Sequence, residues 1–396
     1  MELRSMPFVP ADVLLPKSGF ERWACVACDQ FTSEPEYWEN AERIVGDSPS
    51  ALRCILPEVW LGRDDGKRIA DVNAAMRRYL DGGVFTGYPR SFVYVERTLP
   101  GGQVRRGIVG AVDLTEYDYS PDSKSPVRAT EATVLSRIPP RVAIRRDAPI
   151  ELTHIMLLAD DPADRVIGQF EAEKETLPLL YDFDLMLGGG HIKGRLIDGE
   201  KADRVTAALA GHAAEQPDGG VLISVGDGNH SLATAKECYR LAPSELSRYA
   251  MAELVNLHDP ALAFEPIYRV VFGCDPERLI EKVNAGLTPG KNAVKWYSAC
   301  CEGLLSTDGL PADTLQRAID AYVAETPGSY CDYVHGEDSA VSLGRGENAV
   351  AFLFDGMDKR ELFPYVQTRG ALPRKTFSMG EAKSKRYYVE ARRIKE

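Results

Sequence analysis

Residues 221–235 read VLISVGDGNHSLATA, and this stretch decides the fold that we expect. Val221–Val225 is an apolar run with the length of a buried strand, whereas the residues from Ser231 onwards are typical of a helix. Gly226 and Gly228 interrupt both patterns, because glycine takes backbone conformations that other residues avoid. The stretch therefore predicts a strand that turns sharply into a helix.

A helix N-terminus at this turn is a candidate site for an anion, most simply a phosphate. About four N–H groups at the start of a helix lack an intrahelical partner and carry partial positive charge, so they favour an anionic ligand. His230 can donate to a phosphate or shuttle a proton. Asp227 can bind Mg²⁺ or act as a base. The alternative is a purely structural turn in which Asn229 or Ser231 caps the helix.

Strand and helix patterns alternate on both sides of the turn, which indicates an α+β fold with mixed sheets and packed helices. Residues 91–98 and 103–114 predict a hairpin around Pro100-Gly101-Gly102, and 251–257 and 262–272 predict a second strand pair. Further strands are expected at 23–27, 154–159, 183–187, 191–197, 330–335, 339–343, 349–354 and 386–393. Helices are expected at 69–80, 162–177, 201–214, 231–241, 276–287, 313–324 and 359–369, with another that Ser33 caps.

The chain has 396 residues, which is enough for two or three domains. We expect an N-terminal α/β region with the hairpin at residues 1–120. A central region with the turn is expected at 121–273, and a C-terminal α+β region at 274–396.

The composition argues against several classes of protein. A formal net charge of -12 disfavours binding to duplex nucleic acid, which normally requires a basic face. No stretch approaches the ~18–20 apolar residues of a membrane span, and residues 1–17 contain no apolar run long enough for a signal peptide. We therefore expect a cytoplasmic protein that does not contact membranes. The eight cysteines are expected to be reduced, as is usual in a cytosolic protein. A zinc ribbon is disfavoured, because the CxxC pair Cys25 and Cys28 has no second pair at suitable spacing.

Two basic segments are candidates for the cations of a phosphate site. Five arginines lie close together between residues 128 and 146 of an acidic protein, and a turn near the C-terminus has two cations and a hydroxyl. The candidate residues are Arg128, Arg137, Arg141, Arg374, Lys375 and Thr376. The alternatives are a solvated helix face, if Thr130–Arg137 is a helix, and an exposed basic loop.

Two carboxylates besides Asp227 are candidates for a base that activates a hydroxyl group. Asp29 follows the strand predicted at 23–27, and Glu131 lies within the arginine-rich segment. The alternative for Asp29 is a helix cap. No set of side chains has the spacing of a metal site, so we expect no metal held by the protein alone.

The segment Gly226–Ala235 resembles the Asp-Gly-His-His-Arg-x-x-x-Ala motif of a bacterial and archaeal family, domain of unknown function 1015. Ala27–Gln30, Glu265–Arg269 and Leu372–Phe377 also resemble that family, so the resemblance covers nearly the whole chain. The motif is similar to that of the ParB/sulfiredoxin-like group, which includes a free serine kinase. This resemblance implies a central region of ParB/sulfiredoxin type that binds nucleotide phosphates at the turn, with an adenine nucleotide and Mg²⁺ as cofactors.

Two residues depart from the motif. Ser231 stands where the motif has an arginine, so a bidentate phosphate clamp is missing. Asn229 stands where the motif has its first histidine, and where sulfiredoxin chemistry needs a cysteine. The cations of a phosphate site must therefore come from elsewhere in the chain.

Three functions fit these observations. The first is an enzyme, a small-molecule kinase or phosphotransferase, that transfers a phosphoryl group involving a small metabolite such as serine. The second is a non-catalytic module that senses a nucleotide or a phosphorylated metabolite. The third and weakest is a DNA-associated protein of ParB type, because the chain is acidic and shows no helix-turn-helix pattern. In the first two cases the partner is a small phosphorylated ligand, and the sequence gives no indication of oligomeric state.

Overall fold

The predicted strand before the turn lies inside a large mixed sheet. The computed structural model describes residues 6–396, so residues 1–5, part of the segment in which no signal peptide is expected, lie outside it. The chain divides into two compact units. Unit 1 comprises the chain up to Leu262 together with Val366–Ala371 and Glu381–Glu396, and unit 2 comprises Ala263–Tyr365 and Leu372–Gly380. The division of the sequence at residues 120 and 273 stays a prediction.

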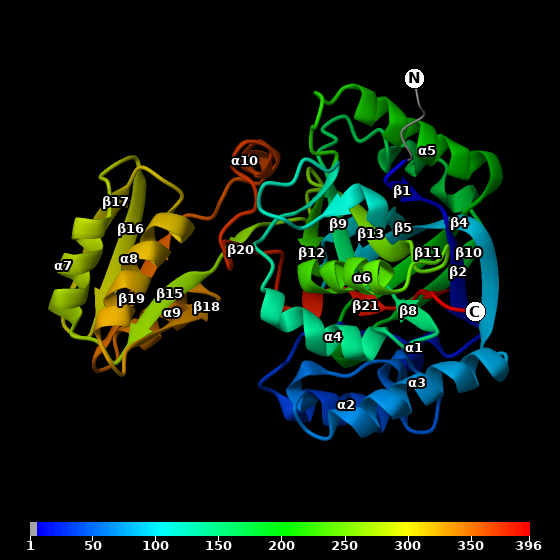
Figure 1. Ribbon diagram of the computed structural model, residues 1–396, viewed down its shortest axis with the longest axis horizontal. Coiled ribbons are helices and arrows are strands. Elements are labelled where there is room, and N and C mark those ends of the chain that lie inside the picture. Colours follow the sequence, from blue (N-terminus) through cyan, green and yellow to red (C-terminus); the bar gives the residue numbers. More distant parts are fainter. Residues whose placement is uncertain (1–5) are drawn as a thin grey trace. The chain divides into compact units, whose positions relative to one another are not determined.

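Unit 1 is built around a 13-stranded sheet, whose main path runs β6-β7-β12-β9-β13-β5-β4-β2-β22-β8 (Figure 1). Three further strands join it, because β1 pairs with β5, β11 with β4, and β10 with β11. Neighbours of β12 differ in direction, with β7 parallel and β9 antiparallel, so the sheet is mixed. The strands are β1 (Phe8–Val9), β2 (Ala11–Pro16), β4 (Phe85–Thr98), β5 (Val104–Asp113), β6 (Tyr117–Asp118), β7 (Val127–Ala129), β8 (Ile150–Leu152), β9 (Ile155–Ala159), β10 (Leu179–Asp184), β11 (His191–Ile197), β12 (Ile223–Asp227), β13 (Tyr249–Asn256) and β22 (Ala391–Arg393).

The hairpin of β4 and β5 confirms the prediction for that segment. Gly102 has a φ of 85°, and its N–H donates to the Leu99 carbonyl at 2.8 Å, which closes the turn. The middle of each strand is apolar on both faces. Phe92 and Tyr94 belong to one core cluster, whereas Val93 and Val95 belong to the other. This alternation follows the two-residue period of a strand, so the sheet is buried from both sides.

Helices cover the two faces of the sheet (Figure 1). Side chains of α5 and α6 pack on one face, and those of α2 and α3 pack on the other. The helices of unit 1 are α1 (Phe20–Trp23), α2 (Pro35–Val45), α3 (Asp65–Asp81), α4 (Ile138–Arg145), α5 (Gly199–Ala214) and α6 (Asn229–Leu241), while α10 (Leu362–Arg369) contains a boundary between the units. Within residues 6–396 no helix has the length and hydropathy needed to span a membrane.

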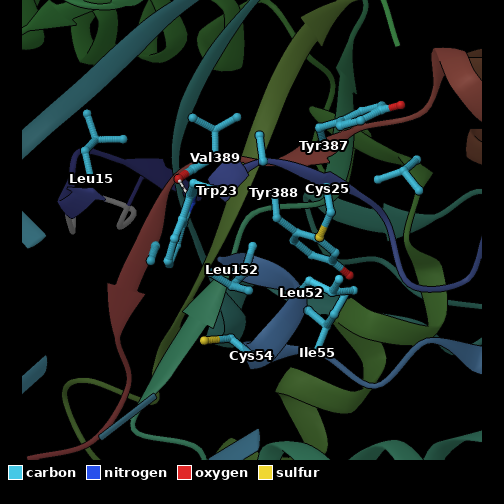
Figure 2. Packing of buried hydrophobic residues seen from close by; sticks show 14 of the residues in the cluster. Leu15, Trp23, Cys25, Leu52, Cys54, Ile55, Leu152, Tyr387, Tyr388 and Val389 are labelled. Atoms are coloured by element: carbon cyan, nitrogen blue, oxygen red, sulfur yellow. Dashed lines mark hydrogen bonds between the residues drawn. The ribbon is translucent and has the colours of Figure 1, made fainter. Parts of the chain in front are cut away.

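The C-terminal segment of the chain completes the core beside α2 and α3. The small sheet of β3 (Cys25–Val26) and β21 (Tyr387–Tyr388) places Tyr388 opposite Cys25. Figure 2 shows the ring of Tyr388 among Cys25, Leu52 and Ile55, and the hydrogen bond that the Trp23 indole donates to the Val389 carbonyl at 2.8 Å. The two ends of the chain are therefore tied together in unit 1.

Unit 2 has its own five-stranded sheet in the order β17-β16-β19-β15-β18. The helices α7 and α8 pack on one face, and α9 packs on the other (Figure 1). A separate pair joins β14 (Glu265–Pro266) to β20 (Phe377–Ser378). The remaining elements are β15 (Tyr268–Phe272), β16 (Asn292–Ser298), β17 (Glu302–Thr307), β18 (Tyr330–Val334), β19 (Ala349–Phe354), α7 (Pro276–Gly286), α8 (Pro311–Glu325) and α9 (Glu337–Gly344). With both units the chain is an α+β protein with mixed sheets.

One predicted helix is wrong because side chains satisfy the backbone locally. Residues 162–177 form only short 3₁₀ turns. The Asp161 carboxylate accepts from the Val166 N–H at 2.9 Å, and Asp164 accepts from the Gly168 N–H at 3.1 Å, which replaces helical bonds. The segment 130–137, for which a helix is one alternative, contains only the 3₁₀ turn Leu135–Arg137, and α4 begins at Ile138.

Three further predictions fail at the boundaries or in the pairing of elements. Residues 339–343 are part of helix α9 and not a strand, because Glu337 and Asp338 favour a helix N-terminus. The strands β13 and β15 do not pair with each other, since β13 joins β5 and β9 whereas β15 joins β18 and β19. The N-cap of α2 is Glu34 and not Ser33, although Pro35 occupies the early position that the sequence suggests.

Candidate functional site

The turn from Gly226 to Ser231 joins the end of β12 to the start of α6, as its sequence predicts. Gly228 is the N-cap of α6, with φ 81° and ψ 25° in the left-handed region. A Cβ atom at this position would lie 3.1 Å from both the Cα and the Cγ1 of Ile155 in β9. Glycine is therefore required here for two reasons, the backbone angle and the close approach of the neighbouring strand.

The start of α6 presents N–H groups that the helix itself does not use. The Gly228 N–H donates to Asp227 Oδ1 at 2.9 Å, and the first helical bond runs from the Leu232 N–H to the Gly228 carbonyl at 3.0 Å. The N–H groups of Asn229 and Ser231 precede that bond, so they have no acceptor within the helix. Gly228 makes no side-chain capping bond, and these groups with the helix dipole create a positive potential.

Asp227 is held as a carboxylate by a lysine from the C-terminal segment. Lys385 Nζ lies 3.2 Å from Asp227 Oδ2, and only 13% of the lysine side chain is exposed. Burial alone would raise the pKa of Asp227, but the Lys385 charge and hydrogen bond and the Gly228 N–H lower it below its usual value. The negative charge of Asp227 would repel an anion at the turn, and Lys385 is the cation that offsets this charge. No pattern in the sequence pointed to Lys385.

Asn229 fastens the start of α6 to the strand beside it. Its amide nitrogen lies 3.4 Å from Thr130 Oγ1 and 3.5 Å from the Val225 carbonyl, and Thr130 donates to that same carbonyl at 2.5 Å. The Asn229 Oδ1 atom is buried without a hydrogen-bond partner within residues 6–396. His230 Nε2 accepts from the Val134 N–H at 3.3 Å, so its ring position is set by the segment after β7.

Ser231 pairs with a histidine that the sequence did not connect to the turn. His154 Nε2 lies 2.7 Å from Ser231 Oγ. Burial lowers the pKa of His154, although the charges of Asp29 and Asp227 act in the opposite direction. The imidazole is therefore neutral at neutral pH. His154 directly precedes β9, the antiparallel neighbour of β12, and this pairing brings it to the turn.

The other two predicted carboxylates also lie toward the turn. Asp29 follows β3 and accepts from Gln30 Nε2 at 3.0 Å, and its charge reaches His154. Glu131 follows β7, which is parallel to β12 with Ala129 opposite Val225. Because parallel strands end at the same edge of a sheet, Glu131 and Asp227 leave the sheet on the same side.

The predicted basic residues of the first segment make hydrogen bonds and ion pairs with groups outside the turn. Arg128 is buried and donates to the carbonyls of Ser125, at 2.8 Å, and Gly219. Arg141 pairs with Glu58 and also donates to the Arg137 carbonyl at 3.0 Å. These contacts hold loops and helices in place, so neither guanidinium is committed to the turn.

The second basic segment belongs to unit 2, whereas the turn belongs to unit 1. Thr376 is buried and donates to the Pro373 carbonyl at 2.7 Å. The carbonyl of Lys375 accepts from Arg269 at 3.0 Å. Arg374 lies in the same loop before β20. These residues stabilise a turn within their own unit, and their part in a phosphate site stays a prediction.

A buried row of charges supports the segment that carries Lys385. Arg386 Nε lies 2.6 Å from Glu253 Oε2, and Arg386 Nη2 lies 2.5 Å from Glu390 Oε2, with all three side chains at most 1% exposed. Glu253 and Asp227 both lie opposite Met156 in the neighbouring strand β9, so these carboxylates occupy one row across the sheet. This row anchors residues 381–396 over the sheet and places Lys385 at Asp227. This row is not predictable from the sequence, because no local pattern links β13 to the C-terminus.

A small cavity lies behind Ser231. Its volume is about 140 Å³, and its wall includes Ser231, His154, Thr234 and Tyr388 together with mainly apolar side chains. Arg141 and Arg145 also line it. Across the described residues, no three or more His, Cys, Asp or Glu side chains form a group that could hold a metal ion.

Comparison with solved structures gives distant likenesses. A free serine kinase in complex with AMP has a TM-score of 0.41 at 11% identity, covering 71% of this chain and 90% of that one. A conserved hypothetical protein from Pyrococcus furiosus has a TM-score of 0.37 at 11% identity, covering 71% and 90%. SbnI with a C-terminal truncation, from Staphylococcus aureus, has a TM-score of 0.37 at 11% identity, covering 72% and 81%. At such scores these likenesses carry no conclusion about chemistry.

Family membership is established by a match along most of the sequence. No curated protein matches the chain. The model of the family described as "Protein of unknown function (DUF1015)" matches residues 9–388, and this chain is therefore a member of that family.

Proposed function

We propose that the turn from Gly226 to Ser231 binds the phosphate of a small-molecule ligand, with an adenine nucleotide as the first candidate. The observation that carries this proposal is the combination of helix N–H groups with a lysine at one short turn. The N–H groups of Asn229 and Ser231 supply donors, and Lys385, 3.2 Å from Asp227, supplies the cation. Lys385 takes the part of the arginine that the family motif has at position 231.

The chemistry that this site supports best is phosphoryl transfer involving a small metabolite such as serine. Positioning and charge stabilisation dominate such reactions, so a fixed set of N–H donors and one lysine fits the task. A carboxylate is needed to accept the proton of the attacking hydroxyl group, and Asp227, Asp29 and Glu131 are the candidates. In this proposal the central region is a nucleotide-binding region of ParB/sulfiredoxin type.

Magnesium belongs to the proposal as an ion that arrives with the nucleotide. Mg²⁺ in proteins is commonly held by one or two carboxylates together with substrate phosphates and water. Asp227 and Glu131, at the same edge of the sheet, are the residues that fit this role. The ion would neutralise charge on the phosphates, while Lys385 and the N–H groups orient them.

The proposal is tested by ligand binding to Lys385→Met and to a matched control, Lys383→Met. Lys383 lies in the same C-terminal segment but pairs with no carboxylate within residues 6–396. Calorimetric titration with AMP, ADP and ATP, with and without Mg²⁺, should give binding to the wild type. Loss of one charge-assisted contact, worth roughly 1.5–3 kcal/mol, should weaken binding by about 10- to 150-fold in Lys385→Met and not in Lys383→Met.

Two outcomes would count against it. Absence of binding by all three nucleotides would exclude the nucleotide, and equal binding by the two variants would exclude Lys385 as the cation. Phosphorus NMR after long incubation with ATP and serine then separates turnover from binding alone. Binding without turnover would support the non-catalytic sensing module and exclude the enzyme.

A further inference from the structure

The cavity behind Ser231 is lined by side-chain groups that the phosphate site does not use. Ser231 Oγ and His154 both line the cavity and lie 2.7 Å apart. The volume of about 140 Å³ is similar to that of an engineered cavity of about 150 Å³ that binds benzene, so there is room for roughly six non-hydrogen atoms. A hydroxyl group in contact with an imidazole thus faces a space of small-molecule size.

One of the two tautomers of His154 gives the pair the chemical state that a nucleophile requires. When the neutral imidazole carries its proton on Nδ1, Nε2 accepts the Ser231 hydroxyl proton. Burial lowers the pKa of His154, so the base form persists below the usual value of about 6.5. The ring lies against Tyr388, with centroids 5.2 Å apart, which restricts its orientation.

The backbone at Ser231 can stabilise negative charge that develops on a reacting group. Ser231 is the third residue of α6, and its own N–H precedes the first helical bond. Such N–H groups act as an oxyanion site when charge develops beside them. The nucleophile and part of its electrostatic support therefore come from the same turn of helix.

The charges of the cavity favour a neutral ligand. Arg145 Nη2 is paired with Glu151 Oε2 at 2.6 Å, and Arg141 is paired with Glu58. The wall thus contains two guanidinium groups and two carboxylates, of which Glu151 also pairs with Arg392, at 2.8 Å. The remaining wall is mainly apolar, so a dianionic phosphate would be a poor occupant and a small neutral ester a good one.

We propose that Ser231 is a nucleophile, with His154 as its general base, that accepts the acyl group of a small carboxylic ester bound in this cavity. Ser231 Oγ forms a bond to the carbonyl carbon while its proton passes to His154 Nε2. The bond from that carbon to the alkoxy oxygen breaks, and His154 returns the proton to the departing alcohol. Water then repeats the sequence on the acyl-serine, which releases the carboxylic acid and restores Ser231. This activity goes beyond phosphate binding at the turn.

The test is covalent labelling with methanesulfonyl fluoride, a small neutral reagent that reacts with activated serines. Attack by Ser231 forms a sulfur–oxygen bond, fluoride leaves, and the proton is taken up by His154. Mass spectrometry of the intact chain and of its peptides should find one adduct, on Ser231. The adduct should be absent from Ser231→Ala and retained in Ser224→Ala, a buried serine of β12 outside the cavity wall.

The role of His154 is tested by the rate of labelling. Since general base catalysis contributes about 10²- to 10⁴-fold, His154→Gln should slow the reaction at least about 100-fold. In the wild type the rate should fall as the pH drops through the pKa of His154, because the protonated ring accepts no proton. Hydrolysis of methyl acetate, followed by acid release, should depend on both residues.

Labelling needs no nucleotide and no Mg²⁺, so this inference and the phosphate site can fail separately. Absence of an adduct on Ser231, or an adduct that persists in Ser231→Ala, would overturn it. A labelling rate in His154→Gln equal to that of the wild type would also overturn it, because Ser231 would then react without its base.

Discussion

Gly228 is the residue on which the geometry of the turn depends most directly. A substitution by alanine faces two separate penalties. The left-handed backbone costs roughly 1–2 kcal/mol for a residue with a Cβ atom, and the added atom would meet Ile155 at 3.1 Å. Gly102, at φ 85°, faces only the first penalty, because nothing lies within 4 Å of its Cβ position.

We therefore predict that Gly228→Ala destabilises the protein more than Gly102→Ala. Gly102→Ala should lose about 1–2 kcal/mol of unfolding free energy. Gly228→Ala should lose about 1–3 kcal/mol more, the usual cost of forcing atoms into a packed site. Urea unfolding followed by circular dichroism measures both. Equal losses of unfolding free energy would mean that Ile155 moves aside freely. The close packing of β9 on the turn would then contribute nothing to stability.

The residues of the candidate site were only partly predictable from sequence. Gly226–Ser231 form a local pattern, in which strand, glycine and helix signals follow one another, and such a pattern can be recognised in one sequence. Lys385 and His154 reach the turn only through pairing of distant strands, β3 with β21 and β9 with β12. Both residues matter because they lie close to the turn in space, and no periodicity or spacing in the sequence predicts that proximity.

At the scale of elements, the segment 381–396 owes its position to buried charge. Glu253 in β13 lies between Arg386, at 2.6 Å, and Arg105, at 3.9 Å, and is fully buried. A buried carboxylate that offsets two guanidinium groups cannot be removed without leaving uncompensated charge. The packing of the C-terminal segment on β5 and β13 thus depends on one side chain, that of Glu253.

We predict that Glu253→Gln loses about 3–5 kcal/mol of unfolding free energy, the usual cost of breaking a buried ion pair. Glu215→Gln is the control, since the pair of Glu215 with Arg165 is exposed and should contribute no measurable stability. Because Lys385 is adjacent to Arg386, the Glu253 variant should also weaken binding at the turn. Denaturant unfolding and nucleotide titration check the two effects, and a stability equal to that of Glu215→Gln would contradict the anchoring role.

Elements with strong local signals were predicted well, and those decided by tertiary contacts were not. The hairpin of β4 and β5 and the strands β11 and β19 follow from β-branched and aromatic residues and turn glycines. The failure at 162–177 has a different origin, because Asp161 and Asp164 offered the backbone alternative hydrogen bonds. The secondary structure of an aspartate-rich stretch with helical periodicity cannot be predicted until the hydrogen-bond partners of its carboxylates are known.

At the scale of the whole molecule, adjacent segments of the chain separate into different units. The pairing predicted for 251–257 and 262–272 is the natural choice for neighbouring strands, yet β13 completes the sheet of unit 1 and β15 begins that of unit 2. Each unit has its own hydrophobic clusters. This organisation implies that the two cores can lose their structure in separate transitions.

The cysteines provide a probe for each unit. Cys25 and Cys54 are 1% and 3% exposed in unit 1, and Cys274 is 3% exposed in unit 2. Burial raises the pKa of Cys54 to about 12 and that of Cys274 to about 11, so these thiols are both covered and protonated in the folded protein. Cys300 and Cys301 at the turn between β16 and β17 are exposed.

We predict that iodoacetamide alkylates Cys300 and Cys301 in the native protein and spares the three buried cysteines. As urea is raised, Cys25 and Cys54 should become reactive together, because they belong to one core cluster. Cys274 should follow its own midpoint, since it belongs to the cluster of unit 2. Peptide mass spectrometry across the urea series reads each cysteine separately. The double variant Cys300→Ser, Cys301→Ser removes the native background, and a single midpoint for all three buried thiols would mean that the two units unfold as one.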